Sequence, residues 1–267
     1  MSTESLNKPA RTSALLSKII PTVLVGVTII WAFTGIDYKG FSKTAGNTIN
    51  AIINGFLNPD WAYVENGSNE DLISLLLLTV AIGFVGTVIS VVGAIPFAFM
   101  TARSARKPKV VSGAGQVILS VLRAFPEIVL AVIFVKMVGP GPFAGALAIG
   151  VHSIGMLGKM YAEEIEKLPK QPIEGIEAVG GSGVQIFRYA KLPLLIPQFL
   201  SLALNRFEIS VRSATILGIV GAGGIGTPII FAIASRSWDR VAIILIGIIV
   251  TVTIIDFVSS FLRKKLQ

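Results

Sequence analysis

Ionisable side chains interrupt long apolar stretches of the sequence. The candidates for a function are Arg123, Glu127, His152, Arg206, Glu208 and Arg212. A charge at the centre of a membrane-spanning helix costs about 2.5–3.5 kcal/mol on insertion scales, so each needs a partner or a function. An arginine fork and a histidine ring can hydrogen-bond an oxyanion, whereas opposite charges can neutralise one another. The residue types therefore predict anion recognition, buried ion pairing, or both.

Spacing along a helix suggests which of these charges can pair locally. Arg123 and Glu127 are four residues apart, as are Glu208 and Arg212, so each pair would share one helix face. Pro126 predicts a kink beside the first pair. Local neutralisation is the simplest interpretation of both pairs.

Arg206 has no partner on its own helix, because it lies only two residues from Glu208 and points to a different face. Asp256 could neutralise it across a helix bundle, or its guanidinium could contact an anionic substrate. His152 could likewise line a path, although an intramembrane histidine is more often an interhelical hydrogen-bonding residue. Both alternatives stay open for both residues.

The elements that position these side chains are long apolar helices. Of the 267 residues, 53% are hydrophobic and 14% charged, and the mean hydropathy is +0.77. The apolar residues form blocks long enough to cross a bilayer of about 30 Å as helices. The predicted spans are 17–36, 72–101, 114–138, 142–161, 197–220 and 241–262. The predicted fold class is an all-α integral membrane protein with about six transmembrane helices.

The basic residues favour one orientation and exclude several classes of function. Most Lys and Arg residues fall before the first span, in the 102–113 and 159–193 segments and after the last span, so both termini are predicted to be cytoplasmic. The net charge of +8 is thus explained by the membrane rather than by nucleic acid. The first apolar run, 19–36, is longer than the apolar region of a signal peptide and lacks a small-residue cleavage pattern, so it is expected to be retained. With no cysteine, thiol chemistry is excluded.

Two further segments lie towards the opposite, outer side. Apolar residues at helical spacing over 41–57 predict a helix along the outer membrane surface. The 221–226 run is rich in glycine but lacks the Lys-Ser/Thr of a nucleotide-binding loop, so it predicts a turn or close helix packing, with an outer gate as the alternative. We expect residues 1–71 to form a tail, the first span and this outer helix, and 72–267 to form the core domain.

The 163–193 loop between the fourth and fifth predicted spans has the pattern of two short helices. Pro172 suits a first helical turn, and Gly180 or Gly181 can adopt the left-handed conformation that ends a helix at 173–179. Ser182 can cap a second helix, for which Val184, Phe187 and the Tyr189-Ala190 pair would provide an apolar side. The sequence predicts a compact helical elbow on the cytoplasmic side.

The loop resembles the EAA loop of bacterial ABC importer permeases. Glu174, Gly180, Leu192 and Pro193 have the spacing Glu-x5-Gly-x11-Leu-Pro, although Gly175 and Ile176 stand where that family usually has alanines. The resemblance implies that a coupling helix docks on a partner ATPase. The implied docking residues are Glu174, Glu177, Ala178, Gly180, Leu192 and Pro193.

The spans look like those of the phosphonate importer permeases, which include relatives that handle phosphite. The similar stretches are 123–127, 152–163 and 206–226. The resemblance implies a type I importer bundle in the bacterial cytoplasmic membrane, working as a dimer with two ABC ATPase subunits and an extracytoplasmic solute-binding protein. It also implies no enzymatic activity and no cofactor in this chain, with ATP-Mg on the partner.

Two rival classes have weaker support in the sequence. A secondary transporter would need coupling-ion carboxylates and usually two related halves, and only Glu127, Glu208 and Asp256 are candidates. A membrane enzyme would need more than a single histidine without a ligand cluster around it. An importer permease for a different small solute also remains open.

Overall fold

The computed structural model describes residues 11–35, 44–65, 71–103 and 109–266, and the regular elements in these ranges are helices. The all-α prediction is therefore confirmed for this part of the chain. Residues 1–10 of the predicted tail, the start of the outer helix at 41–43 and residues 104–108 of the basic 102–113 segment lie outside the described residues.

The chain divides into two compact units, Met1–Ala51 and Ile52–Gln267. The first unit holds α1, Arg11–Thr34, and the beginning of α2, Thr44–Leu57. Helices were predicted at both places, and both are present. The boundary lies inside α2, whereas the predicted division at residue 71 stays a prediction.

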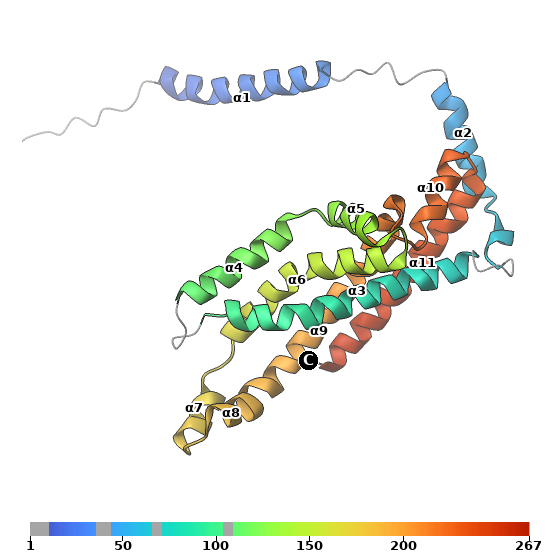
Figure 1. Ribbon diagram of the computed structural model, residues 1–267. Coiled ribbons are helices and arrows are strands. Elements are labelled where there is room, and N and C mark those ends of the chain that lie inside the picture. Colours follow the sequence, from blue (N-terminus) through green and yellow to red (C-terminus); the bar gives the residue numbers. More distant parts are fainter. Residues whose placement is uncertain (1–10, 36–43, 66–70, 104–108, 267) are drawn as a thin grey trace, which may run out of the picture. The chain divides into compact units, whose positions relative to one another are not determined.

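The second unit contains the helices that carry the candidate residues. They are the end of α2, α3 (Leu72–Thr101), α4 (Lys109–Ala124), α5 (Glu127–Val138), α6 (Pro142–Glu166), α7 (Gln171–Ala178), α8 (Gly183–Gln185), α9 (Leu192–Leu217), α10 (Gly226–Ala234) and α11 (Trp238–Leu266). Within this unit, α3, α6 and α9 lie side by side (Figure 1). Local sequence sets several helix starts: Asp71 accepts the backbone N–H of Ser74 at 2.9 Å, and Pro142 occupies the first turn of α6.

Three helices in the described part of the chain are long and apolar enough to span a membrane: α3, α6 and α11. The α4–α5 pair makes a fourth if it is counted as one bent span. The apolar part of α1, Ile19–Thr34, is shorter, and α9 carries three charged residues in its second half. The multi-pass architecture is confirmed, while the count of six spans stays a prediction.

The predicted third span is not one helix. The chain breaks at Phe125 and Pro126, and the axes of α4 and α5 differ by 83°. A proline cannot donate a backbone hydrogen bond and restricts the residue before it, so a helix readily ends at this place. The predicted kink is therefore present but far larger than a bend within one helix.

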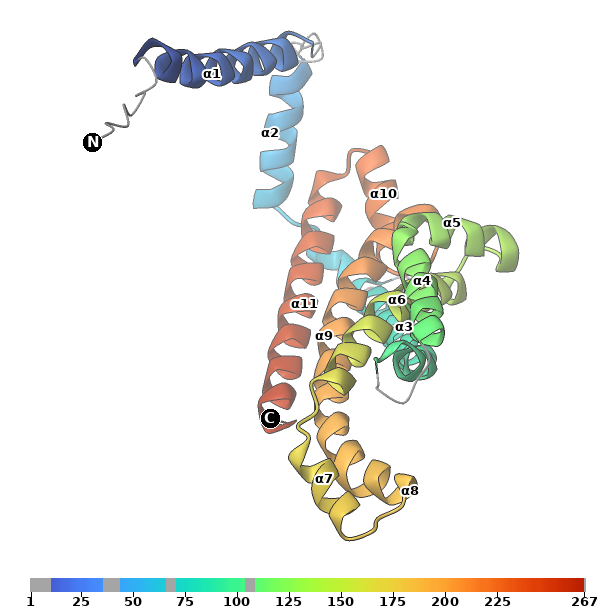
Figure 2. The same ribbon diagram turned by 90° about the vertical axis from the view of Figure 1, so that its left-hand side faces the viewer.

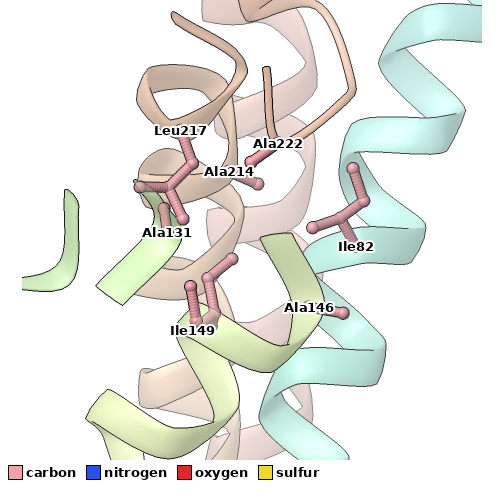
Figure 3. Packing of buried hydrophobic residues seen from close by; sticks show 8 residues of the cluster. Ile82, Ala131, Ala146, Ile149, Ala214, Leu217 and Ala222 are labelled. Carbon is pink, nitrogen blue, oxygen red and sulfur yellow. The ribbon is translucent and has the colours of Figure 1, made fainter. Parts of the chain in front are cut away.

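Small residues bring the central helices close together. Ile82, Ala146, Ile149, Ala214 and Leu217 belong to one buried cluster that joins α3, α6 and α9 (Figure 3). A Cβ atom at Gly86 on α3 would lie 2.8 Å from Cγ2 of Ile149 on α6. Dense contact of this kind between helices is the main source of stability when the surroundings are lipid.

The two ends of the bundle differ. The α7–α8 elbow lies at one end of α9, and α10 lies at the other (Figure 2). The carboxyl-terminal end of α11 points towards the elbow (Figure 2). We call these the elbow end and the α10 end of the second unit.

Candidate functional site

The first short helix of the elbow forms as its sequence predicts. Pro172 lies in the first turn of α7, and the helix stops before Gly180, whose φ of +80° is left-handed. The N–H of Gly181 donates to the carbonyl oxygen of Ile176 at 2.9 Å, and that of Gly180 to Glu177 at 3.0 Å. These bonds satisfy carbonyls that the end of a helix leaves unpaired. The helix runs from Gln171 to Ala178, slightly earlier than the predicted 173–179.

Ser182 caps the second short helix, as predicted. Its Oγ accepts the backbone N–H of Gln185 at 3.4 Å, and the Gln185 side chain accepts the N–H of Ser182 at 2.7 Å. This reciprocal pair is a capping box, which fixes where the helix begins. The chain then passes through a π-helical turn, Ile186–Lys191, directly into α9.

The apolar side predicted for the second helix needs correction. Ile186 and Ala190 are the buried residues, and Phe187 packs edge-on against Phe99 with ring centroids 5.8 Å apart. Val184 and Tyr189 are instead 76% and 65% exposed. The prediction is therefore right for Ala190 and, through its contact with Phe99, for Phe187, but wrong for Val184 and Tyr189. The helical period changes within the π-helical turn that holds Tyr189.

The outer face of α7 presents three of the six predicted docking residues. Glu174, Glu177 and Ala178 are exposed, whereas Ile173 and Ile176 are half-buried on the other face. Val179 just beyond the helix is 83% exposed. The elbow therefore offers a short helix with carboxylates and an exposed apolar residue at its end.

Arg206 is buried in the middle of the bundle, where it is 5% exposed. Its Nε donates to Oγ of Ser153 on α6 at 2.7 Å, and Nη1 lies 3.3 Å from the sulfur of Met156. Nη2 is buried and has no hydrogen-bond partner among the described residues. Asp256 pairs with Arg212 at 3.5 Å, so the alternative in which Asp256 neutralises Arg206 is wrong.

The proposed pair of Arg123 and Glu127 is also wrong, because the α4–α5 break separates the two residues onto different helices. Glu127 instead accepts a hydrogen bond at 2.9 Å from the hydroxyl of Ser213 on α9. Its second oxygen, Oε1, is buried without a partner among the described residues. Glu127 and Arg206 thus each hold one buried polar atom whose hydrogen-bonding capacity is unused.

The predicted pair of Glu208 and Arg212 is replaced by two pairs between α9 and α11. Glu208 binds Nη2 of Arg263 at 2.8 Å, and Arg212 binds Asp256 at 3.5 Å. Residues four apart can pair on one helix, but partners on a neighbouring helix compete with them. These two contacts join α9 to α11.

His152 lies where α4 ends. Its Nδ1 is 3.1 Å from the carbonyl oxygen of Phe125. Because a carbonyl oxygen only accepts, this hydrogen bond requires a proton on Nδ1. The ring thereby satisfies a carbonyl freed by the helix break, and Nε2 is left for another contact.

The glycine run forms a tight turn at the α10 end. Gly221, Gly223 and Gly224 all have positive φ, and the N–H of Ile225 donates to Oγ1 of Thr79 on α3 at 2.9 Å. A Cβ at Gly226 would lie 2.2 Å from the carbonyl oxygen of Thr215. The expectation of a turn with close helix packing is confirmed.

Sequence reasoning missed four residues of these networks: Ser153, Met156, Ser213 and Arg263. Ser153 directly follows His152 in the sequence. Its position on the same helix was the signal that could have identified it as part of the network. Arg263 lies in a basic cluster that the orientation argument had assigned to the membrane surface. Side chains that complete a site across helices carry no sequence spacing that identifies them.

Comparison with known proteins identifies the family to which this chain belongs. The profile of the binding-protein-dependent transport system inner membrane components matches residues 94–267, so the chain belongs to that family. In fold, it is similar to a chain of the MetNI methionine ABC transporter in an inward-facing conformation, with a TM-score of 0.62 and 20% identity over 73% of this chain and 96% of that one.

Two relatives indicate which kind of permease this chain resembles. The chain is 40% identical over 192 residues to the phosphite transport system permease protein PtxC of Stutzerimonas stutzeri, covering 72% of this chain and 70% of the relative. It is 37% identical over 196 residues to the phosphate-import permease protein PhnE of Mycolicibacterium smegmatis, covering 73% of this chain and 37% of that one. The resemblance to permeases of the phosphonate and phosphite importers is therefore confirmed.

Proposed function

We propose that this chain is the membrane subunit of an ATP-driven importer for phosphite, phosphonate or a related phosphorus oxyanion. The exposed outer face of α7, a helix that is followed by the left-handed Gly180 and by the Ser182 capping box, is the observation that carries the ATP-driven part. The substrate class is taken from the names of the relatives, one of which is a phosphite permease and another a phosphate-import permease.

The working unit is proposed to be two copies of the chain with two ABC ATPase subunits. Each ATPase would receive one α7, with Glu174, Glu177 and Ala178 in its groove and Gly180, Leu192 and Pro193 fixing the direction of the elbow. Because the second short helix continues into α9 without a loop, motion of the elbow would pass directly to the charged part of that helix. ATP-Mg would bind only to the partner subunits.

A cycle of rigid-body movement follows from this connection. When the ATPases close on ATP, the two elbows would approach each other and the bundles would rock from one open side to the other. An extracytoplasmic binding protein would deliver the oxyanion at the α10 end. We accordingly place the elbow end and both termini in the cytoplasm of a bacterial cell, with the helices in its cytoplasmic membrane.

The proposed path runs along α9 and the α4–α5 break. Arg206 would be its central cation, because its buried Nη2 retains an unused donor. His152 and Arg123 would extend the path on the elbow side of the break. Glu208 and Arg212, which are paired with Arg263 and Asp256, would provide fixed, compensated charges along the path. An oxyanion could supply the acceptor that Nη2 of Arg206 lacks when the bundle opens.

Two alternatives make different predictions. A permease for another small solute would dock the same ATPase but accept a different ligand from its binding protein. A secondary transporter would need no ATPase, and its candidate coupling carboxylates would be Glu127, Glu208 and Asp256. In the structure, Glu208 and Asp256 bind arginines, which fits fixed charge compensation better than a site for a moving cation.

Purification of the tagged chain from native membranes tests the docking proposal. We expect an ATPase to co-purify with the wild-type chain and to be lost from Gly180→Arg, while the variant still inserts. Gly46→Arg is the matched control, since a Cβ at Gly46 meets no atom within 4 Å and lies outside the elbow. Equal ATPase recovery from both variants would contradict the proposed docking site.

The ligand held by the partner binding protein tests the substrate class. We expect phosphite, a phosphonate or inorganic phosphate to bind it, measured by calorimetry with each compound. Binding of none of these, together with binding of an unrelated solute, would leave the importer class intact and refute the oxyanion.

A further inference from the structure

A crevice of about 330 Å³ opens at the elbow end between α3, α4 and α6. Its size is near the lower limit of small-molecule pockets, which run from about 300 to 1,000 Å³. The charged residues in its wall are Arg103, Arg123, Lys159, Glu163 and Glu166. It extends along more than two turns of α6, from Glu166 to Gly155.

The carboxylates in this wall are already engaged. Oε1 of Glu166 accepts the backbone N–H of Arg103 at 2.7 Å. Glu163 lies 3.9 Å from Nζ of Lys159, and both side chains are about half exposed, so this ion pair is weak. The acidic residues therefore do not neutralise all the cations of the crevice.

The donors in the wall have spare capacity. Arg123 makes no hydrogen bond or ion pair with the residues that the structure describes, and its guanidinium carries five N–H donors. Thr101 also lines the crevice, but its Oγ1 is buried beside Gly115 of α4, where a Cβ on Gly115 would lie 2.5 Å from it. The free guanidinium of Arg123 is therefore the main unused donor of the wall.

We propose that this crevice binds a phosphate-type oxyanion, with Arg123 and Lys159 as its charged contacts. A guanidinium fork matches two oxygens of such a group, and the ammonium of Lys159 supplies a mobile second charge. The ligand lies between α4 and α6, next to the point where α6 leads into the elbow. The inference takes its ligand class from the proposed function and needs no transport step.

Two sources share this chemistry: a free oxyanion released on the cytoplasmic side, and the headgroup of an anionic lipid. The experiment measures thermal unfolding of the delipidated full chain in a neutral detergent. One arm adds sodium phosphate, a second adds phosphatidylglycerol, and a third adds sodium chloride at matched ionic strength. A ligand that binds only the folded state raises Tm.

We expect phosphate to raise Tm of the wild-type chain more than chloride does, and the increase to be lost in Arg123→Gln and in Lys159→Gln. Lys136→Gln is the matched control, because Lys136 is exposed on α5 and outside the crevice, and it should keep the increase. Arg123→Lys, which keeps the charge without the fork, should keep part of it. If Arg123→Gln does not fold, Lys159→Gln alone decides the outcome.

An increase with phosphatidylglycerol but not with phosphate, still dependent on Lys159, supports the site and identifies the lipid headgroup as its source. An equal increase of Tm in all variants overturns the proposal. So does the absence of any increase in the wild-type chain with both phosphate and phosphatidylglycerol. The result is separable from the proposed function, since failed uptake with an intact Tm increase refutes transport alone. Working uptake without any increase refutes this site alone.

Discussion

The Nε atom of Arg206 on α9 donates a 2.7 Å hydrogen bond to Oγ of Ser153 on α6. The same hydroxyl donates to the carbonyl oxygen of Ile149 one turn earlier. Ser153 thus uses both its donor and an acceptor, and it holds a buried charge between two central helices. This contact makes the interior of the bundle dependent on one small side chain.

Ser153→Ala should destabilise the protein, because it leaves Nε of Arg206 buried without an acceptor. Such an uncompensated group costs about 1–3 kcal/mol, with the upper part expected for a charged donor. Denaturant unfolding in micelles measures the change. Ser201→Ala is the control: Ser201 lines an open groove beside Arg263, and its change should be neutral. Equal stability of the two variants would show that the Arg206–Ser153 bond contributes nothing.

Gly226→Ala should also destabilise the protein, since the new Cβ would lie 2.2 Å from the backbone oxygen of Thr215. Overpacking against atoms that cannot move aside costs about 1–3 kcal/mol. Gly113→Ala is the matched change in α4, where no atom lies within 4 Å of the new Cβ. That control should be neutral or stabilising by up to about 1 kcal/mol. Thermal unfolding of both variants in one detergent compares them, and a Gly226 variant as stable as the control would argue against tight packing there.

The predictions from sequence succeeded where geometry is local. Pro172, Gly180 and Ser182 each have a preferred backbone role, so the elbow could be predicted from their order alone. The predicted ion pairs were wrong for the opposite reason, because the contacts of these charged residues are not local in sequence. Glu208 binds Arg263, more than fifty residues away in sequence, because α9 and α11 meet there. Spacing within one helix contains no information on which helix lies beside it.

The α4–α5 break shows a second limit. Pro126 predicts a disturbance, but its angle is set by what the neighbouring helices can satisfy. Here His152 bonds the carbonyl of Phe125, and Ser213 bonds Glu127 just beyond the break. These tertiary contacts stabilise a bend of 83° that the sequence of the segment alone does not specify.

Asp71, the N-cap residue of α3, predicts that the stability of the folded protein depends on pH. Hydrogen bonds from the side chain and then the backbone N–H of Ser74 lower the pKa of Asp71 in the folded protein. Its stabilising effect is therefore fully present above the unfolded pKa of about 3.9 and is lost as the pH falls through the lower folded value.

Asp71→Asn keeps a capping side chain but removes this titration. We expect the free energy of unfolding of the wild-type protein to exceed that of Asp71→Asn at neutral pH, and the difference to shrink in acid. Unfolding curves for both proteins across that pH range measure it. A difference that grows on acidification would have the wrong sign for a lowered pKa.

Gly180→Ala should weaken ATPase association without unfolding the bundle. A residue with a Cβ costs about 1–2 kcal/mol in the left-handed conformation, which corresponds to roughly a 5–30-fold loss if the elbow must relax before docking. Gly183→Ala changes a glycine of the same elbow that has no positive φ and no atom within 4 Å of the new Cβ. Affinity of the purified partner ATPase for each variant, measured by surface plasmon resonance, should fall only for Gly180→Ala. Equal affinities for the two variants would show that docking does not require the left-handed conformation of Gly180.

Uptake by reconstituted liposomes tests the central claim most directly. The chain is reconstituted with its partner ATPase and binding protein, and uptake of labelled phosphite is followed with and without ATP-Mg. We predict uptake only when ATP-Mg, the ATPase and the binding protein are all present, and its loss with Gly180→Arg but not with Gly46→Arg. Uptake at the same rate by the chain alone, without ATPase or ATP, would contradict an ATP-driven importer.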